Sequence, residues 1–302
     1  MAEVKKFIRS FLVVAGIIYL MDLSIGTGLK KMYQNQRSGY LYRSTYAIDS
    51  TTAGFLVIGS SRANHHYDSK IFEDELNAVF YNCGRDGQNV IYSCALSSAI
   101  IQRYKPKLII LDVLPNEFTT RDEDRLSSLL PYHDNEAIKS YLKYYGPFEN
   151  IKLISQIYPY NSLLTSLLTG ISEKNKKRSE DYHGYTKLEG TMPDAPLVEF
   201  SEPGKVDSIK LKVFQDMLAR LDLEGIPVLV VFSPMYFKYK PTTSAEICSR
   251  LCSQYKTIRF LNFASDSAFR ESRFFKDNNH LNETGAKLFS EELVRNIQTL
   301  IR

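Results

Sequence analysis

The sequence lacks the excess of positive charge that nucleic-acid-binding proteins use to contact phosphates. Its 302 residues include 38 Lys and Arg against 34 Asp and Glu, so the formal net charge is only +4. The densest basic run, residues 174–178, is flanked by Glu173 and Glu180 and is typical of a solvated loop. Because binding to DNA or RNA depends on many phosphate contacts from basic side chains, we expect no nucleic-acid partner.

Cysteine is scarce, and the four that occur have no histidines at the spacing of a zinc site. Cys248 and Cys252 are four residues apart, a spacing that places them on one face of a helix, while Cys83 and Cys94 form no motif. We therefore expect no metal and no other cofactor. No cysteine lies near the N-terminus, which excludes a lipoprotein anchor there. The sequence also shows no internal repeat and no low-complexity segment.

Long apolar runs are absent except near the N-terminus. Basic residues precede an apolar run, 11–21, which ends at Asp22. This order is typical of a secretory signal or a signal-anchor. We expect residues 1–30 to form a retained transmembrane helix, because residues 7–29 are long enough to span a bilayer. The positive flank then stays in the cytoplasm and the body of the chain is extracytoplasmic, on the periplasmic side. The alternatives are cleavage near Gly26 and an amphipathic first helix of a soluble protein.

What is present is an ordinary globular composition, 44% hydrophobic and 24% charged, in which apolar runs alternate with amphipathic segments. We expect strands at 55–58, 79–82, 107–113, 227–232 and 257–263, and helices at 63–76, 90–104, 207–224, 244–255 and 283–301. Repeated strand–helix units whose strands are apolar throughout predict a three-layer α/β/α fold with a doubly wound, mostly parallel sheet.

The alternation stops between residues 119 and 205, a polar stretch rich in tyrosine. We interpret it as a helical insertion within a single domain that spans residues 31–302, and residues 32–50 as a connecting arm. Aromatic rings in the insertion would either stack on sugars or simply pack the insertion onto its domain.

Two polar motifs near opposite ends of this domain suit acyl chemistry. Ser61 follows the apolar run 55–58 at a Gly59-Ser60-Ser61 turn, and ligands of an open parallel sheet bind beyond the carboxyl ends of its strands. Asp277 precedes His280 by three residues, so its carboxylate can orient the imidazole while the imidazole takes a proton from Ser61. The alternative interpretations are a helix cap for the serine turn and a surface turn for the Asp277–His280 pair.

Acyl transfer also needs N–H donors for the oxyanion of the tetrahedral intermediate. Gly87 can bring its N–H close to a substrate because it has no side chain, and Asn116 can offer a carboxamide. Arg62 is a cation at a helix start, where the helix dipole opposes it. We interpret Arg62 as a binder of an anionic substrate group such as a uronate or phosphate, or else as one half of a surface salt bridge. The adjacent His65 and His66 are interpreted as packing or surface residues.

This set resembles the SGNH (GDSL-type) hydrolase superfamily, in which four sequence blocks supply Ser, Gly, Asn and His. The matching stretches are Gly59-Ser60-Ser61, residues 82–87, residues 114–117 and residues 277–280. The resemblance implies a flavodoxin-like fold and a triad of Ser61, Asp277 and His280. It also implies an oxyanion hole made by the Ser61 and Gly87 N–H groups and the Asn116 side chain. With its N-terminal anchor and Gly-Ser-Ser-Arg form, the chain is similar to the membrane-anchored bacterial branch associated with cell-surface polysaccharide O-acylation.

The resemblance implies an exported serine esterase or acyltransferase acting on O-acyl groups, above all O-acetyl groups, of a cell-surface glycan. Two departures from the family pattern favour an alternative. Ser60 stands where the family has Asp before the nucleophile, and Pro115 stands where it has Gly before the block-three Asn. The alternative is a catalytically weak glycan-binding or assembly subunit that partners a membrane O-acyltransferase. A structural anchor protein with a chance Ser/His pair is the third interpretation.

Overall fold

The computed structural model describes residues 1–120, 126–146, 148–172, 181–202 and 204–301, and it divides into two compact units. The first unit comprises Met1–Tyr42 and Leu126–Lys176, and the second comprises Arg43–Arg125 and Lys177–Arg302. The expected insertion, residues 119–205, differs from this division, because only its middle part lies outside the sheet-bearing unit. That middle part, Leu126–Lys176, belongs to the same unit as the N-terminal segment because the two share a hydrophobic core. The basic run 174–178 lies outside the described residues.

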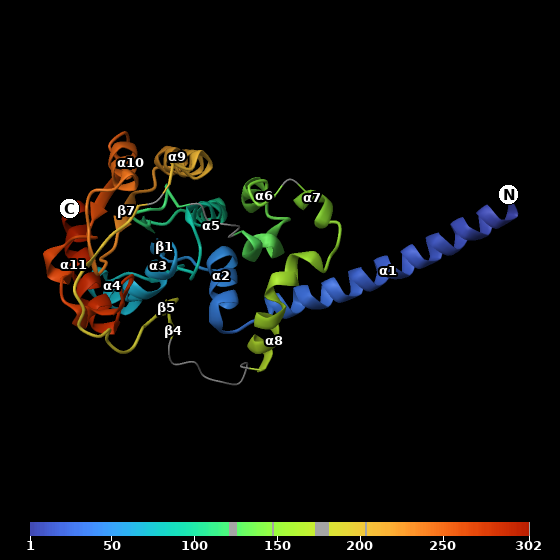
Figure 1. The fold of residues 1–302 in the computed structure, drawn as a ribbon, viewed down its shortest axis with the longest axis horizontal. Helices are drawn as coiled ribbons and strands as arrows, with labels where there is room; N and C mark the ends of the chain where they lie inside the picture. Colours follow the sequence, from blue (N-terminus) through green and yellow to red (C-terminus); the bar gives the residue numbers. More distant parts are fainter. Residues whose placement is uncertain (121–125, 147, 173–180, 203, 302) are drawn as a thin grey trace. The chain divides into compact units, whose positions relative to one another are not determined.

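A five-stranded parallel sheet forms the centre of the second unit (Figure 1). Its strands lie in the order β2-β1-β3-β7-β9. Its strands are β1 (Phe55–Ile58), β2 (Phe80–Asn82), β3 (Leu108–Asp112), β7 (Val228–Phe232) and β9 (Ile258–Asn262). Counted along the chain, this order is 2-1-3-4-5, which is the flavodoxin-like arrangement. The direction of winding reverses between β1 and β3, so the crevice at the carboxyl ends of these two strands is where such folds bind ligands.

Helices cover both faces of this sheet and confirm the expected three layers. On one side α5 (Val90–Arg103) packs with α9 (Ser208–Leu223), and on the other α11 (Glu283–Ile301) packs on α3 (Ser61–His66) and α4 (Ser69–Leu76) (Figure 1). Helix α10 (Thr243–Cys252) contacts β9. The remaining short elements of the unit are β4 (Asp181–Tyr182), β5 (Tyr185–Thr186), β6 (Val198–Glu199), β8 (Phe237–Lys238), η3 (Ser267–Phe269), η4 (Ser272–Phe274), β10 (Phe275–Asp277) and β11 (His280–Leu281).

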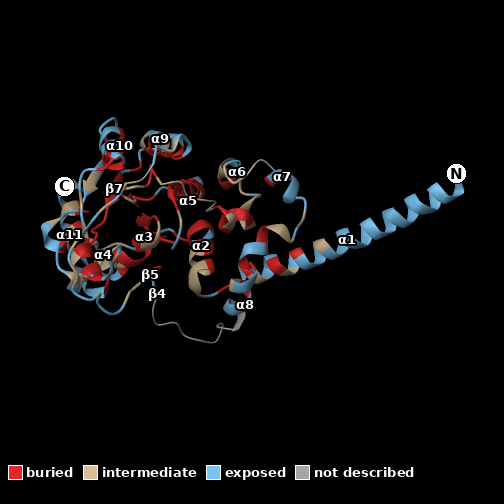
Figure 2. Cartoon of the chain, viewed as in Figure 1, coloured by how far each residue is buried: buried red, intermediate tan, exposed pale blue. Residues whose placement is uncertain are grey.

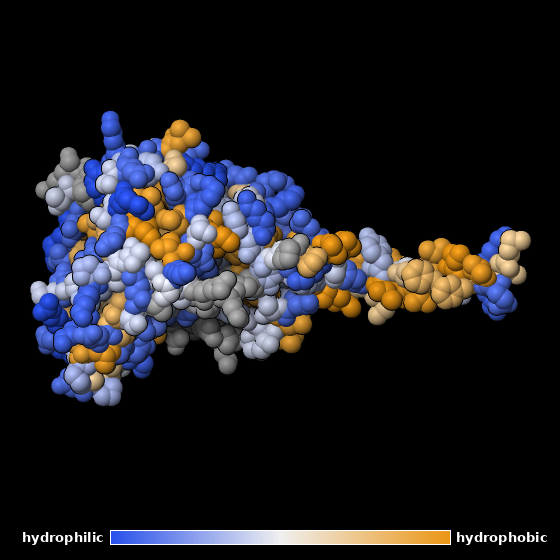
Figure 3. All heavy atoms as spheres, turned by 45° about the horizontal axis from the view of Figure 1, so that its top comes forward, coloured by the Kyte–Doolittle hydropathy of each residue, from blue (hydrophilic) through white to orange (hydrophobic). Residues whose placement is uncertain are grey.

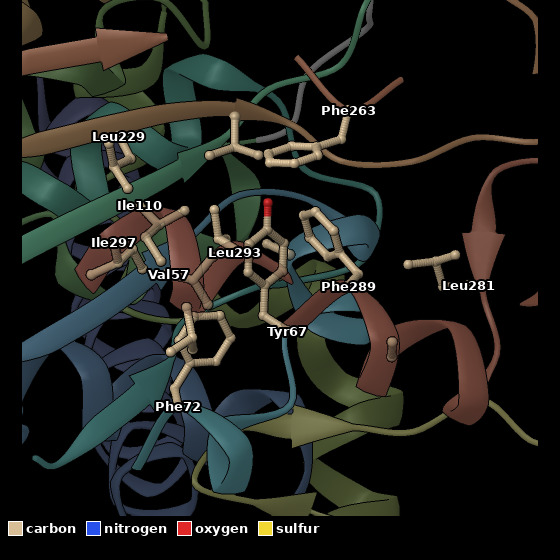
Figure 4. Close-up of a cluster of buried hydrophobic side chains, with 14 of the residues drawn as sticks. Val57, Tyr67, Phe72, Ile110, Leu229, Phe263, Leu281, Phe289, Leu293 and Ile297 are labelled. Carbon is tan, nitrogen blue, oxygen red and sulfur yellow. The ribbon is translucent and has the colours of Figure 1, made fainter. Parts of the chain in front are cut away.

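The core between the sheet and α11 shows why the apolar runs become strands. Val57, Ile110 and Leu229 point from three neighbouring strands toward Phe289 and Leu293 of α11 (Figure 4). All five side chains are at most 3% exposed. Burying a side chain of this size contributes about 1.5–3 kcal/mol, so the continuous apolar runs are the main source of stability for the layer.

The expected helix 63–76 is wrong in one respect, because it forms as two helices. The chain becomes extended at Tyr67 and Asp68, and the Asp68 side chain accepts a hydrogen bond from the Lys70 N–H (3.0 Å) to cap α4. Aspartate is a strong helix cap, and here that preference outweighs the continuous helical periodicity. The expected connecting arm 32–50 contains a helix, α2 (Gly39–Asp49). The other expected strands and helices are confirmed to within a few residues of their ends.

The first unit is helical and begins with α1 (Ala2–Gln34). This helix has 33 residues and is long and apolar enough to cross a membrane, a property that signal sequences share. Its first two thirds are exposed (Figure 2). Leu29 and Tyr33 enter a small core with Tyr160. Tyr132 and Tyr160 each have ring centroids 6.0 Å from that of Tyr33, so these two tyrosines pack the unit. Its other elements are η1 (Ser127–Tyr132), α6 (Glu136–Leu142), α7 (Glu149–Lys152), η2 (Tyr158–Leu163) and α8 (Leu164–Ser172).

Gly84, in the loop after β2, permits the closest contact between that loop and α3. A Cβ atom at Gly84 would lie 2.2 Å from the backbone nitrogen of Asn64. We therefore expect Gly84→Ala to lower the free energy of unfolding by about 1–3 kcal/mol, measured by urea denaturation, because the loop and the helix must separate. Gly54→Ala is the matched control, since its Cβ would meet Lys107 Cδ at an ordinary 3.5 Å. Equal stability of the two variants would contradict this assignment.

Candidate active site

Ser61 lies at the first residue of α3, directly after β1 and at the position where the sheet reverses its winding. Ser60 precedes it as the N-cap in an extended conformation, with no side-chain capping hydrogen bond. Gly59 is required by the tight approach to β3, because a Cβ there would lie 2.7 Å from the carbonyl oxygen of Asp112. The sharp turn therefore presents the Ser61 hydroxyl at the carboxyl end of the sheet.

The structure brings Ser61, His280 and Asp277 together. Ser61 Oγ lies 2.8 Å from His280 Nε2, and His280 Nδ1 lies 3.0 Å from each carboxylate oxygen of Asp277. A carboxylate only accepts, so Nδ1 carries the hydrogen, and Nε2 of the neutral ring is left to accept the serine proton. Residues 219 positions apart thus form a hydrogen-bonded Ser–His–Asp series.

Asp277 is held in its charged form by the hairpin that carries it. Its Oδ1 accepts hydrogen bonds from the N–H groups of Asn279 (2.8 Å) and His280 (3.0 Å) as well as from the imidazole. Partial burial opposes ionisation, but these hydrogen bonds, that of the His280 side chain foremost, outweigh it and hold the pKa of Asp277 below its ordinary value. The carboxylate is therefore available to stabilise a protonated His280.

The expected role of Arg62 in substrate binding is wrong, as is the expected surface salt bridge. Its side chain is 1% exposed, and Nε donates to Ser233 Oγ at 3.0 Å and lies 3.8 Å from Asp112 Oδ1. One residue beyond Ser61, the helix has turned about 100°, so Arg62 points into the protein while Ser61 faces the crevice. Burial raises the pKa of Asp112, and the guanidinium offsets part of that rise.

His66 joins the same buried cluster to the hairpin that carries His280, a role that no sequence pattern indicated. Its Nε2 accepts the N–H of Leu281 (3.0 Å) and its Nδ1 donates to Ser233 Oγ (3.0 Å). Complete burial, together with the nearby charge of Arg62, lowers the pKa of His66 well below its ordinary value. A neutral ring is the form that this pattern requires, because only a neutral imidazole has an accepting nitrogen. Leu281 follows His280, so His66 fixes the hairpin relative to α3.

His65 fixes the loop that carries Gly87 relative to α3. Its Nδ1 donates to the carbonyl of Thr186 (2.6 Å), and its Nε2 lies 3.3 Å from Asp86 Oδ2. Asn64 adds a hydrogen bond to Asp86 Oδ1 (2.7 Å). Burial opposes the charge on Asp86, but the contacts with His65 and Asn64 prevail and lower its pKa to about 2. The contacts of the charged Asp86 carboxylate with His65 and Asn64 hold the turn of Asp86 and Gly87 against α3.

Gly87 and Asn116 carry unused donors. Gly87 is exposed and has φ +70°, and its N–H makes no hydrogen bond to any described residue. Asn116 is half-buried on the turn after β3, and within the described part of the chain its carboxamide is likewise without a hydrogen bond. Ser60, Gln88 and Glu117 line one small cavity, which shows that the turns following β1, β2 and β3 adjoin one another.

A buried ion pair supports the turn of Asn116. Lys210 Nζ donates to the carbonyls of Glu117 (3.0 Å) and Thr120 (2.9 Å) and lies 3.4 Å from Glu117 Oε1. The same carboxylate oxygen accepts the N–H of Val90 at the start of α5 (3.0 Å). The pair thus joins the β3 turn to two helices, and it is a support that sequence inspection missed because the partners are 93 residues apart.

The described residues contain no group of three His, Cys, Asp or Glu side chains placed to hold a metal ion. The four cysteines are buried as free thiols, and burial raises the pKa of the Cys252 thiol to about 12. Such thiols are poor nucleophiles. Among the described residues, Ser61 is therefore the candidate nucleophile.

No protein-family model matches the chain, and no curated protein matches it. A similar solved structure is that of a protein from Streptococcus pneumonia provisionally described as a platelet activating factor. It is 11% identical with a TM-score of 0.43, and the alignment covers 94% of this chain and 98% of that chain. Likeness at this level carries no functional argument, so function is inferred from the geometry of the site.

Removing the Arg62 side chain tests the buried cluster. We expect Arg62→Ala to lower the free energy of unfolding by about 3–5 kcal/mol, because Asp112 is left buried without its cation. Lys70→Ala is the control, since it breaks an exposed pair with Asp74 (3.0 Å) and should cost less than about 1 kcal/mol. Both are measured by urea denaturation followed by circular dichroism. If Arg62→Ala proved as stable as Lys70→Ala, the guanidinium would not support this site.

Proposed function

We propose that this protein is an exported serine esterase or acyltransferase that acts on O-acyl groups, in particular O-acetyl groups, of a cell-surface polysaccharide. The observation that carries the proposal is the pair of contacts made by His280: 2.8 Å to the Ser61 hydroxyl and 3.0 Å to the Asp277 carboxylate. The resemblance to the SGNH hydrolase superfamily, and to its membrane-anchored branch, supports the substrate class.

In the first half of the reaction, Ser61 Oγ attacks the carbonyl carbon of the acyl ester while its proton passes to His280 Nε2. Asp277 stabilises the imidazolium that forms. The oxyanion of the tetrahedral intermediate is bound by the N–H groups of Ser61 and Gly87 and by the carboxamide of Asn116. Collapse of the intermediate breaks the ester bond, and His280 returns the proton to the departing sugar oxygen.

The second half consumes the acyl-serine. A water molecule, or the hydroxyl of a second sugar, loses its proton to His280 and attacks the acyl carbon. The bond between that carbon and Ser61 Oγ then breaks, His280 returns the proton to Ser61 Oγ, and the carboxylic acid or the new ester is released. Hydrolysis and transfer differ only in this acceptor. Each oxyanion donor is worth roughly 10²–10³ in kcat, so the unused N–H groups of Gly87 and Asn116 support an acyl-transfer site.

The proposal places α1 in the cell membrane as a retained anchor with the sheet-bearing unit on the extracytoplasmic side. Basic residues Lys5, Lys6 and Arg9 precede the apolar run, and positive flanks remain in the cytoplasm. An anchored enzyme on that side meets surface glycans directly.

The alternative, a catalytically weak glycan-binding or assembly subunit beside a membrane O-acyltransferase, depends on Ser60 and Pro115. The hydrogen bond between Ser61 and His280 is present although Ser60 and Pro115 depart from the family pattern. The turn before Ser61 also forms without a side-chain capping hydrogen bond from Ser60, so it does not need a carboxylate there. These observations favour the catalytic proposal.

A serine-directed fluorophosphonate probe tests the nucleophile. We expect the purified protein to be labelled and Ser61→Ala to abolish labelling, because the activated hydroxyl is lost. Ser60→Ala is the matched control, since the neighbouring side chain has no capping hydrogen bond to lose, and it should keep its labelling. A well-folded native protein that resists the probe would exclude the proposal.

The role of Asp277 is tested separately with a small acetyl ester. We expect Asp277→Asn to lower kcat by about 10⁴ with KM nearly unchanged, because the amide no longer stabilises the imidazolium or its tautomer. Because the pKa of Asp277 is below its ordinary value, the carboxylate remains charged over the pH range in which an ordinary Asp becomes protonated. The decrease of kcat at acid pH should therefore not follow the titration of an ordinary Asp. Retention of activity by Asp277→Asn would remove this residue from the triad.

A further inference from the structure

The first unit exposes a row of large apolar side chains outside α1. Phe148, Ile151 and Ile154 are 64%, 65% and 69% exposed. They recur every three residues, and the helical turn continues past α7 because the Ile154 N–H donates to the Ile151 carbonyl (3.2 Å). The three side chains therefore share one side of this short helix. We call them the interfacial face.

The interfacial face is tied to the point at which α1 leaves the unit. The Asp22 carboxylate of α1 accepts hydrogen bonds from the Ser155 hydroxyl (2.6 Å) and the Gln156 N–H (2.7 Å). One turn further along α1, Gly26 approaches so closely that a Cβ there would lie 2.4 Å from Gln156 Cβ. Ile154 thus directly precedes the residues that bind α1. Figure 3 shows hydrophobic residues gathered around the base of the projecting helix.

The length of α1 indicates how far a bilayer must reach. From Arg9, the last basic residue before the apolar run, to Asp22 the helix rises about 20 Å, at about 1.5 Å per residue. The hydrocarbon core of a bilayer is about 30 Å thick, so its two boundaries lie at or beyond these charged residues. Arg9 can extend its side chain toward the headgroups. Asp22 is suited to the other boundary, because its hydrogen bonds come from the protein.

The charges beside the interfacial face are also compensated. Glu149 is the acidic residue of α7, and its carboxylate accepts hydrogen bonds from Lys152 Nζ (2.7 Å) and from the Tyr158 hydroxyl (2.6 Å). Its side chain is 4% exposed. Lys152 is half-exposed and carries the positive charge outward. An apolar face bordered by a lysine, with its acidic residue neutralised, suits the boundary between lipid headgroups and acyl chains.

We propose that Phe148, Ile151 and Ile154 insert into the headgroup–acyl boundary of the bilayer that α1 spans. The inference rests on the anchoring role given to α1 in the proposed function. A helix alone leaves its unit free to tilt and rotate, whereas a second contact beside the helix fixes the orientation of the first unit on the membrane. The face is then a lipid-binding surface, and no partner protein is required to cover it.

The absence of tryptophan from the sequence makes the test direct. Single-tryptophan variants Phe148→Trp and Ile151→Trp of the full chain are reconstituted in phosphatidylcholine–phosphatidylglycerol vesicles with or without brominated acyl chains. We expect their emission to shift to shorter wavelength and to be quenched about twofold by the brominated lipid, as for a ring at the acyl boundary. Leu223→Trp, at a residue 87% exposed in the second unit, is the control and should be unaffected.

A fourth variant, Tyr19→Trp, reports on α1 itself and separates the outcomes. If Tyr19→Trp is quenched while Phe148→Trp and Ile151→Trp behave like Leu223→Trp, the interfacial face lies outside the bilayer and the inference is wrong, although the anchor stands. If Tyr19→Trp is also unquenched, anchoring and inference fail together. A blue shift without quenching, seen only after a membrane protein fraction is added, assigns the face to a protein partner and overturns the inference. Circular dichroism confirms that each variant is folded, and probe labelling of Ser61 is scored independently.

Discussion

The site depends on a buried hydrogen-bond cluster centred on the hydroxyl of Ser233. This oxygen, at the end of β7, accepts hydrogen bonds from Arg62 Nε (3.0 Å) and His66 Nδ1 (3.0 Å), both on α3. Arg62 extends the cluster to Asp112 on β3, and His66 extends it to the backbone of Leu281. The cluster therefore joins the helix that carries Ser61 to the hairpin that carries His280. Because polar groups in a low-dielectric core are costly unless satisfied, this cluster favours one arrangement of those elements.

The two loops that carry the expected oxyanion donors have supports of their own. His65 and Asn64 hold Asp86, which precedes Gly87, while Lys210 and Glu117 hold the turn of Asn116. In both cases a charged group is fixed by partners from another element. The Gly87 N–H and the Asn116 carboxamide make no hydrogen bond to described residues. The hydrogen bonds are made instead by the adjacent residues Asp86 and Glu117, so the two donors stay available. In the proposed reaction, such preorganisation lowers the reorganisation needed when charge develops on the substrate.

Much of this could be anticipated from the sequence. The continuous apolar run Phe55–Ile58 favours a strand buried on both faces, and all four residues are buried in β1. The Asp277–His280 contact is local, spanning one hairpin. Helix α11 keeps the bounds that its periodicity indicates. The interpretation of Arg62 was wrong because a cation at a helix start suggested an exposed side chain, whereas the rotation of α3 places this side chain in the core. The role of His66 could not be found, since its partner Leu281 is 215 residues away.

The sequence by itself determined the strands, most of the helices and the long apolar helix at the N-terminus, because these depend on local periodicity and on which residues exclude water. Tertiary structure decided the rest. The winding of the sheet placed Ser61 beside His280, and the rotation along α3 turned Arg62 away from the crevice. A shared hydrophobic core grouped residues 126–176 with the N-terminal segment. The physical reason is that burial and long-range hydrogen bonds depend on which distant element covers a residue, and no local pattern encodes that partner.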